Sequence, residues 1–122
     1  MKLQLAGTSA RNTITGYGAG YVVVNGARYE ENLIVLADRI LPWSAARFET
    51  LGAENFLELA KLDLEVVLLG TGATLRFPRP HVTRPLVEAR IGFEVMDAQA
   101  ACRTFNILAA EERRVAAALL LR

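Results

Sequence analysis

The stretch VLLGTGATLRFP at residues 67–78, together with FEVMDAQAACRTFN at residues 93–106, decides how this chain folds. Each stretch begins as a short apolar strand and ends abruptly in polar, turn-forming residues. In an α/β sheet, ligands bind at that end of the strands. The two stretches therefore predict one site, built from two loops that follow neighbouring parallel strands.

Around these stretches the apolar spacing alternates between the period of a strand and that of a helix. A helix is predicted from Ala53, because apolar residues then recur on one stripe. The elements that follow are predicted to be strands at 65–69, 93–96 and 115–121 and helices at 81–90 and 98–109. A strand–helix–strand–helix order is typical of parallel strands joined by crossovers.

The N-terminal third has an antiparallel pattern. Strand-like runs near residues 13–24 lead to Asn25-Gly26, which favours a type I′ hairpin turn because both positions need a positive φ. The return strand is expected to continue through residues 27–37, from an exposed rim into the middle of the fold. Pro42 keeps the next extended piece at an edge. The chain is therefore expected to form an α/β domain with a mixed sheet.

Composition narrows the function classes. A chain of 122 residues makes a single domain, predicted to span residues 1–122. With 14 basic and 13 acidic side chains it lacks the basic character of a nucleic-acid-binding protein. Its apolar run at 115–121 is far shorter than the ~20 residues of a membrane-spanning helix, and residues 1–7 are too short for a signal peptide. One cysteine indicates a reducing, cytoplasmic location.

Seven short motifs, in order along the chain, resemble a known family. They are ITGYG (14–18), VVNG (23–26), LPW (41–43), LLGTG (68–72), FP (77–78), EVMD (94–97) and ACRTFNIL (101–108). The family is catalogued as domain of unknown function 498, and the resemblance covers about residues 12–120. Its eukaryotic members include the mitochondrial respiratory complex I assembly factor 3.

The resemblance implies a single α/β domain in three layers with a central mixed sheet, which bacteria and archaea have as a stand-alone protein. It also implies that eukaryotic relatives bind a partner assembly factor, with no enzymatic activity established. This sequence shows no mitochondrial targeting extension before the similar region. A bacterial protein is therefore expected, and its role need not be the eukaryotic one.

Gly70, Thr71 and Gly72 suggest a loop whose backbone N–H groups approach an anion. The dinucleotide-binding motif is incomplete, because Leu75 stands where a third small residue is needed and the helix begins only near residue 81. A simple turn is the favoured interpretation. In the same loop, Arg76 and Arg79 either neutralise an anionic ligand or lie in solvent.

Four polar residues of the second stretch are further ligand or partner-binding candidates: Asp97, Arg103, Thr104 and Asn106. Asp97 is better explained as a helix N-cap than as a catalytic base. Arg103, Thr104 and Asn106 are proposed to line a pocket beside the Gly70–Gly72 turn. The equally open alternative is that Arg103 pairs with a carboxylate and Asn106 caps or bridges a loop.

No recognisable catalytic set accompanies these candidates. Cys102 shares the apolar face of its helix and is expected in the core, where a free cysteine acts as a small hydrophobic residue. His81, the single histidine, is expected in a surface loop, so no catalytic residue, metal or cofactor is predicted. Trp43 and the three tyrosines are either core or rim residues or anchors for a partner.

Two hypotheses follow. The first is a non-catalytic binding protein that docks on a protein client, in the assembly of a respiratory or membrane complex. The alternative is a small-molecule or anion-binding protein, conceivably an enzyme, with its site at Gly70–Gly72, Arg76, Arg103 and Asn106. Edge strands and the 52% apolar content are also compatible with a homo-oligomer.

Overall fold

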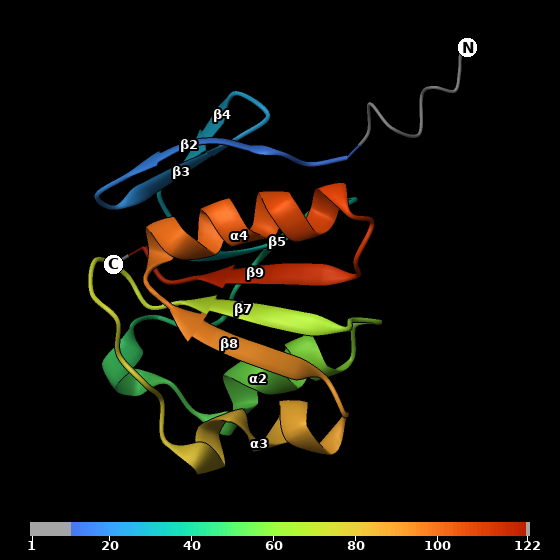
Figure 1. Cartoon of the computed structure of the whole chain (residues 1–122). Coiled ribbons are helices and arrows are strands. Elements are labelled where there is room, and N and C mark those ends of the chain that lie inside the picture. The colour runs from blue at the N-terminus through green and yellow to red at the C-terminus, as the bar shows by residue number, and fades with distance from the viewer. Residues whose placement is uncertain (1–10, 122) are drawn as a thin grey trace.

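The computed structural model describes residues 11–121. Figure 1 shows two sheets, with helices on both faces of the larger one. In chain order the elements are β2 (Ile14–Gly18), β3 (Tyr21–Val24), β4 (Ala27–Tyr29), β5 (Leu33–Leu36), β6 (Ile40–Pro42), the 3-10 turn η1 (Phe48–Thr50), α2 (Ala53–Ala60), β7 (Val66–Gly70), α3 (Pro80–Glu88), β8 (Gly92–Met96), α4 (Ala98–Ala110) and β9 (Val115–Leu119).

The larger sheet is mixed, with strand order β6-β5-β9-β7-β8. The strands β7, β8 and β9 run parallel, joined by α3 and α4, whereas β5 and β6 pair antiparallel. The predicted strand–helix alternation and the edge position of Pro42 are thus confirmed. Every residue of β7 and β9 is buried, which explains why both strands are apolar throughout rather than alternating.

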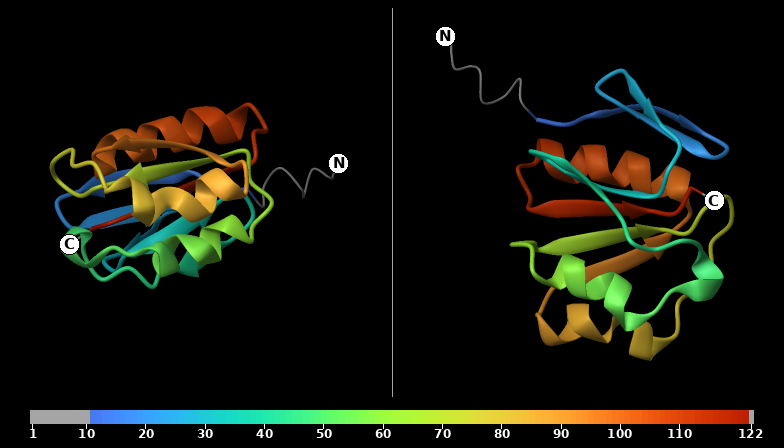
Figure 2. Two further views of the ribbon diagram at one scale, coloured as in Figure 1. Left: turned by 90° about the horizontal axis from the view of Figure 1, so that it is seen from below. Right: turned by 180° about the vertical axis from the view of Figure 1, so that it is seen from behind.

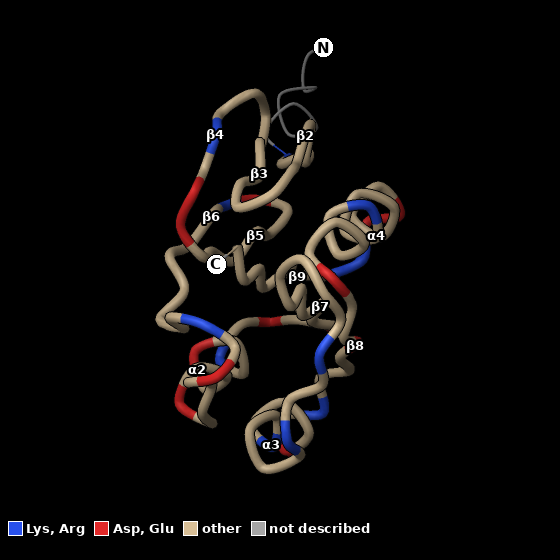
Figure 3. The backbone as a smooth tube through the Cα atoms, turned by 90° about the vertical axis from the view of Figure 1, so that its left-hand side faces the viewer, with Lys and Arg blue, Asp and Glu red and all other residues tan. Residues whose placement is uncertain are grey.

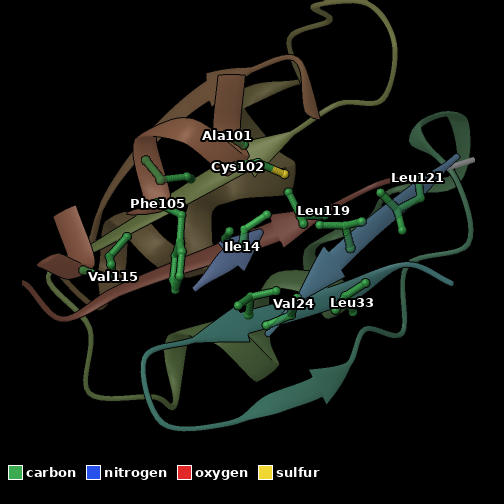
Figure 4. Close-up of a cluster of buried hydrophobic side chains, with 14 of the residues drawn as sticks. Ile14, Val24, Leu33, Ala101, Cys102, Phe105, Val115, Leu119 and Leu121 are labelled. Atoms are coloured by element: carbon green, nitrogen blue, oxygen red, sulfur yellow. The ribbon is translucent and has the colours of Figure 1, made fainter. Parts of the chain in front are cut away.

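Three layers result, as the family resemblance implied. Figures 1 and 2 show α2 and α3 on one face of the larger sheet, and α4 with the small sheet on the other. Alternate residues of β9 point to the two faces: Ala117 and Leu119 join the cluster beneath α4, while Ala116 and Ala118 join the one beside α2 and α3. Figure 4 shows the first cluster, in which Cys102 and Phe105 of α4 lie among these strand residues.

The hairpin at Asn25-Gly26 is confirmed by its backbone, with φ of 52° and 84°. The prediction of one continuous return strand is wrong, because residues 27–37 divide between two sheets. β4 pairs with β3 in the small sheet, while β5 pairs with β6 and β9 in the large one. The strand pairing is interrupted at residues 30–32, between the end of β4 and the start of β5.

Asn32 fixes this break from inside the protein. Its side chain is buried, and its Nδ2 donates to the carbonyl oxygens of Ala45 and Ala46, both at 2.9 Å. Its Oδ1 accepts from the Leu121 N–H at 2.7 Å. One buried amide therefore joins the crossing point to the loop after β6 and to the end of the chain described here.

Trp43 belongs to the core rather than to an exposed partner-binding surface. It is 6% exposed and meets Phe56 edge-on, with ring centroids 5.8 Å apart. Its indole N–H donates to the Asn55 carbonyl oxygen at 2.9 Å, which satisfies the polar atom of a buried tryptophan. Within residues 11–121, no helix is long and apolar enough to cross a membrane.

The first turn of α4 lies directly on the end of β7, and Gly70 makes this possible. A Cβ atom at Gly70 would lie 3.0 Å from the Ala98 Cα and 3.1 Å from the Ala101 Cβ. It would also lie 3.0 Å from the Leu119 Cδ2. A side chain at this position would therefore require Ala98, Ala101 or Leu119 to move by a few tenths of an ångström.

We expect Gly70→Ala to lower the free energy of unfolding by about 1–3 kcal/mol, the usual cost of overpacking a filled core. Gly16→Ala is the matched control, because a Cβ there meets Val23 at an ordinary 3.5 Å. Urea unfolding of both variants provides the measurement. Equal stability of the two variants would show that α4 adjusts freely.

Candidate functional site

The loops that follow β7 and β8 meet at the same edge of the sheet, as predicted. The two strands are parallel neighbours with Gly70 opposite Met96. The Thr71 N–H donates to the Met96 carbonyl oxygen at 2.9 Å, and the Ala98 N–H donates to the Gly72 carbonyl oxygen at 2.8 Å. The loops within the two sequence stretches therefore lie together at one end of the large sheet.

The Gly70–Gly72 turn is closed by hydrogen bonds within the chain. The Thr71 side chain is fully buried; its hydroxyl donates to the Thr74 carbonyl oxygen at 2.7 Å and accepts from the Arg76 N–H at 3.1 Å. Gly72 has a φ of 87°, a backbone conformation that residues other than glycine rarely adopt. The glycines are thus explained by close packing at Gly70 and by turn geometry at Gly72.

The N-terminus of α4, beside this turn, already has acceptors. The Ala98 N–H donates to the Gly72 carbonyl oxygen, and the Ala100 N–H donates to Asp97 Oδ1 at 2.8 Å. Asp97 is therefore the predicted N-cap, with its backbone extended and its carboxylate on the first turn. These two N–H groups, which an anion at a helix N-terminus would use, are occupied by the chain itself.

The candidate residues further along α4 make their hydrogen bonds to the small sheet. Arg103 Nη1 donates to the Tyr17 hydroxyl at 3.2 Å. Asn106 Oδ1 accepts from the Ile14 N–H at 2.9 Å, and its Nδ2 donates to the Ile14 carbonyl oxygen at 2.8 Å. Thr104 lies half-buried on the same helix. Asn106 thus ties α4 to a strand, β2, rather than to a loop, and Arg103 hydrogen-bonds a hydroxyl rather than a carboxylate.

Arg76 braces the loop after β7 against the 3-10 turn η1. Its Nη1 lies 2.8 Å from Glu49 Oε2, and its guanidinium carbon lies 4.5 Å from the centre of the Phe48 ring. The pKa of Glu49 is lowered by a hydrogen bond from its own backbone N–H, and further by Arg76. Arg76 thus has a carboxylate and an aromatic ring as neighbours before any ligand binds.

Beside this brace is a surface hollow that the sequence interpretation did not identify. It has a volume of about 470 Å³ and lies between η1 and the loop leading into α3. Phe77, in its wall, is 71% exposed, and Leu75 in the same loop is 50% exposed. The sequence did carry a signal for this surface. Leu75 and Phe77 are apolar residues in the loop between the Gly70–Gly72 turn and Pro78, where no strand or helix face is available to bury them.

The single cysteine and the single histidine of the chain differ in their exposure. Cys102 is 1% exposed, and burial raises the pKa of its thiol to about 11, as expected for a core residue. His81 is exposed at the start of α3. Among residues 11–121, no group of three or more histidine, cysteine, aspartate or glutamate side chains is arranged to hold a metal ion.

The fold and the paired strand ends define a small α/β domain of a kind already known from bacteria. A Bordetella parapertussis protein of known crystal structure matches with a TM-score of 0.85 and 40% identity, over 91% of this chain and 96% of that one. The family model "Protein of unknown function (DUF498/DUF598)" matches residues 14–120. The chain belongs to this family.

Two curated relatives extend the comparison. A Bos taurus protein named NADH dehydrogenase [ubiquinone] 1 alpha subcomplex assembly factor 3 is 33% identical over 109 residues, 88% of this chain. This chain spans 59% of that relative's length. A Rhodobacter capsulatus protein, described as uncharacterized, is 32% identical over 107 residues, which are 88% of this chain and 82% of that protein. The family therefore includes relatives named as complex I assembly factors.

We expect Asn106→Ala to lower the free energy of unfolding by about 1–3 kcal/mol, because both backbone groups of Ile14 lose their partner in a partly buried place. Arg103→Ala, on the same helix, is the control and should leave stability nearly unchanged, since its side chain is exposed. Urea unfolding tests both. A larger loss in Arg103→Ala would contradict the assigned roles.

Cys102 should react slowly with a maleimide in the folded protein and rapidly in urea-unfolded protein. The thiolate is the reactive form, and both burial and the raised pKa suppress it. Mass spectrometry of timed samples gives the two rates. Labelling of the folded protein as fast as that of the unfolded protein would contradict the core assignment.

Proposed function

We propose that this chain binds a protein partner and takes part in the assembly of a respiratory or membrane complex. The bovine relative, 33% identical over 88% of this chain, is named as an assembly factor of NADH dehydrogenase. The sequence similarity is the basis for extending the assembly role of that protein to this chain. The binding of a protein partner is our inference from the exposed apolar residues of this chain.

One observation carries the proposal. The sheet end, where α/β proteins bind ligands, is filled by the chain's own groups. The Gly72 carbonyl and the Asp97 carboxylate occupy N–H groups of the first turn of α4, and Thr71 is completely buried. What this end presents to solvent instead is the apolar side chains of Leu75 and Phe77. Exposed aromatic residues of this kind are typical anchors of protein interfaces.

The alternative, a small-molecule or anion site at the same turn, has less support. It requires Arg76, Arg103 and Asn106 to face one ligand beside Gly70–Gly72. The hydrogen bonds of Arg103 and Asn106 instead lead to Tyr17 and Ile14 of β2. Arg76 is held by Glu49. Asn106 would have to give up its contacts with Ile14, and the two arginines are directed through Nη1 to Glu49 and Tyr17 rather than to a common point.

Affinity capture of the tagged full chain from its native cells tests the proposal. We expect the same protein to be recovered in repeated purifications, and mass spectrometry to identify it as a subunit or assembly factor of a respiratory or membrane complex. An unrelated tagged domain of similar size, expressed at the same level, is the control. Recovery of no reproducible partner above this control would contradict the proposal.

A further inference from the structure

We infer that the hollow between η1 and the loop into α3 docks a partner segment in which apolar side chains lie next to a carboxylate. We call this hollow the Phe77 surface, and define it by Phe48, Leu51, Phe77, Pro78, Arg79 and His81. The inference rests on the proposed partner-binding function and adds the place and the chemistry of the contact.

The floor and walls of the Phe77 surface supply the apolar contact. Phe48 and Leu51 are half-buried and pack on the core cluster beside α2 and α3, so their outer faces are held still. Phe77 stands above them with 71% of its surface exposed. An apolar residue inserted here would contact the aromatic rings of Phe48 and Phe77, and aromatic residues are enriched among the anchors of interfaces.

The surface is braced before a partner arrives. Arg76 connects its two walls, because it reaches from the loop to Glu49 at 2.8 Å and lies over the Phe48 ring. Arg76 and Glu49, which connect the two walls, are 27 residues apart in sequence. A surface already held in shape loses less conformational entropy on binding, which favours affinity.

The charges favour an acidic partner. Of the residues lining the hollow, Glu49 is the single acidic one, and it is paired with Arg76. Arg47 also lowers the pKa of Glu49, so this carboxylate has two basic neighbours. Arg79 forms no ion pair with another residue in the 11–121 range. Together with Arg79 of the lining, the neighbouring Arg47 and Arg76 therefore set three positive charges against the one carboxylate of Glu49.

The start of α3 reinforces this preference. Arg79 is the N-cap of α3 and supplies no side-chain acceptor to the helix, and the first turn carries no acidic residue. The positive end of the helix dipole is thus not offset by a carboxylate of the first turn of α3. Figure 3, viewed from this end of the molecule, shows basic stretches along the segment that leads into α3, and acidic ones on α2.

A second hollow, at the opposite end of the strands, provides a useful comparison. Its volume is about 480 Å³ and it is also lined by arginines, but three of them have carboxylate partners. These pairs are Arg39 with Asp38, Arg113 with Glu65, and Arg114 with Asp63. In that hollow three of the four lining arginines have a carboxylate partner, whereas Arg79, the arginine that lines the Phe77 surface, has none among residues 11–121.

The test uses a combinatorial peptide library displayed on phage, selected against the immobilised full chain. We expect enriched peptides to place Asp or Glu beside Leu, Ile or Phe. Their synthetic versions should bind Phe77→Ser at least about tenfold more weakly than the unmodified chain, the factor that corresponds to 1.4 kcal/mol. Arg79→Glu should reverse the charge preference of the selected peptides.

Ile107→Ser is the matched control, because Ile107 is 60% exposed on α4 and lies outside the Phe77 surface. It should bind the peptides like the unmodified chain. Thermal unfolding of each variant verifies the fold, and the exposed position of Phe77 makes a loss of folding unexpected. Absence of any enriched peptide, enrichment without acidic residues, or unchanged binding by Phe77→Ser would each overturn the inference.

The outcomes also separate this inference from the function on which it rests. A native partner captured equally by the unmodified chain and by Phe77→Ser would uphold the proposed function and overturn the site. Capture of no partner by either form would overturn the function itself. Analytical ultracentrifugation tests for a dimer of the chain. A dimer that Phe77→Ser abolishes would assign the surface to a second copy and overturn the inference of an acidic partner segment.

Discussion

The close approach of α4 to the end of β7, permitted by Gly70, is the contact on which the rest of the structure depends. With no Cβ at this position, Ala98 and Ala101 rest on the strand, and the first turn of α4 begins where the loop after β7 ends. The same approach lets Gly72 accept from Ala98. The loops after two parallel strands are thereby joined into one rigid end, rather than left open as a ligand cleft.

α4 then transmits this constraint to the small sheet. Its inner face covers β7 and β9, while Asn106 pairs with both backbone groups of Ile14 in β2. Asn32 performs a similar task where the chain passes from one sheet to the other. Two amide side chains, each used as donor and acceptor, therefore hold together segments that are far apart in sequence, and a buried amide without these partners would be costly.

The end of the sheet after β7 and β8 is occupied by contacts within the chain, which determines which groups remain exposed there for binding. The Thr71 hydroxyl and the Ala98 and Ala100 N–H groups have partners within the chain, and the loop after β7 exposes Leu75 and Phe77. The exposure of Phe77 beside basic residues is the reason why we propose this end as a surface for a partner. The family also includes relatives that are named as assembly factors.

The sequence by itself determined the strand–helix order, the Asn25-Gly26 hairpin, the parallel pairing of the strands before Gly70 and Asp97, and the burial of Cys102. These features follow from local backbone preference and apolar period, which a sequence carries directly. Tertiary structure alone decided that the return strand divides at Asn32. It also decided that Asn106 turns to β2 and that Phe77 stays exposed, because each outcome depends on segments distant in sequence that compete for the same neighbours.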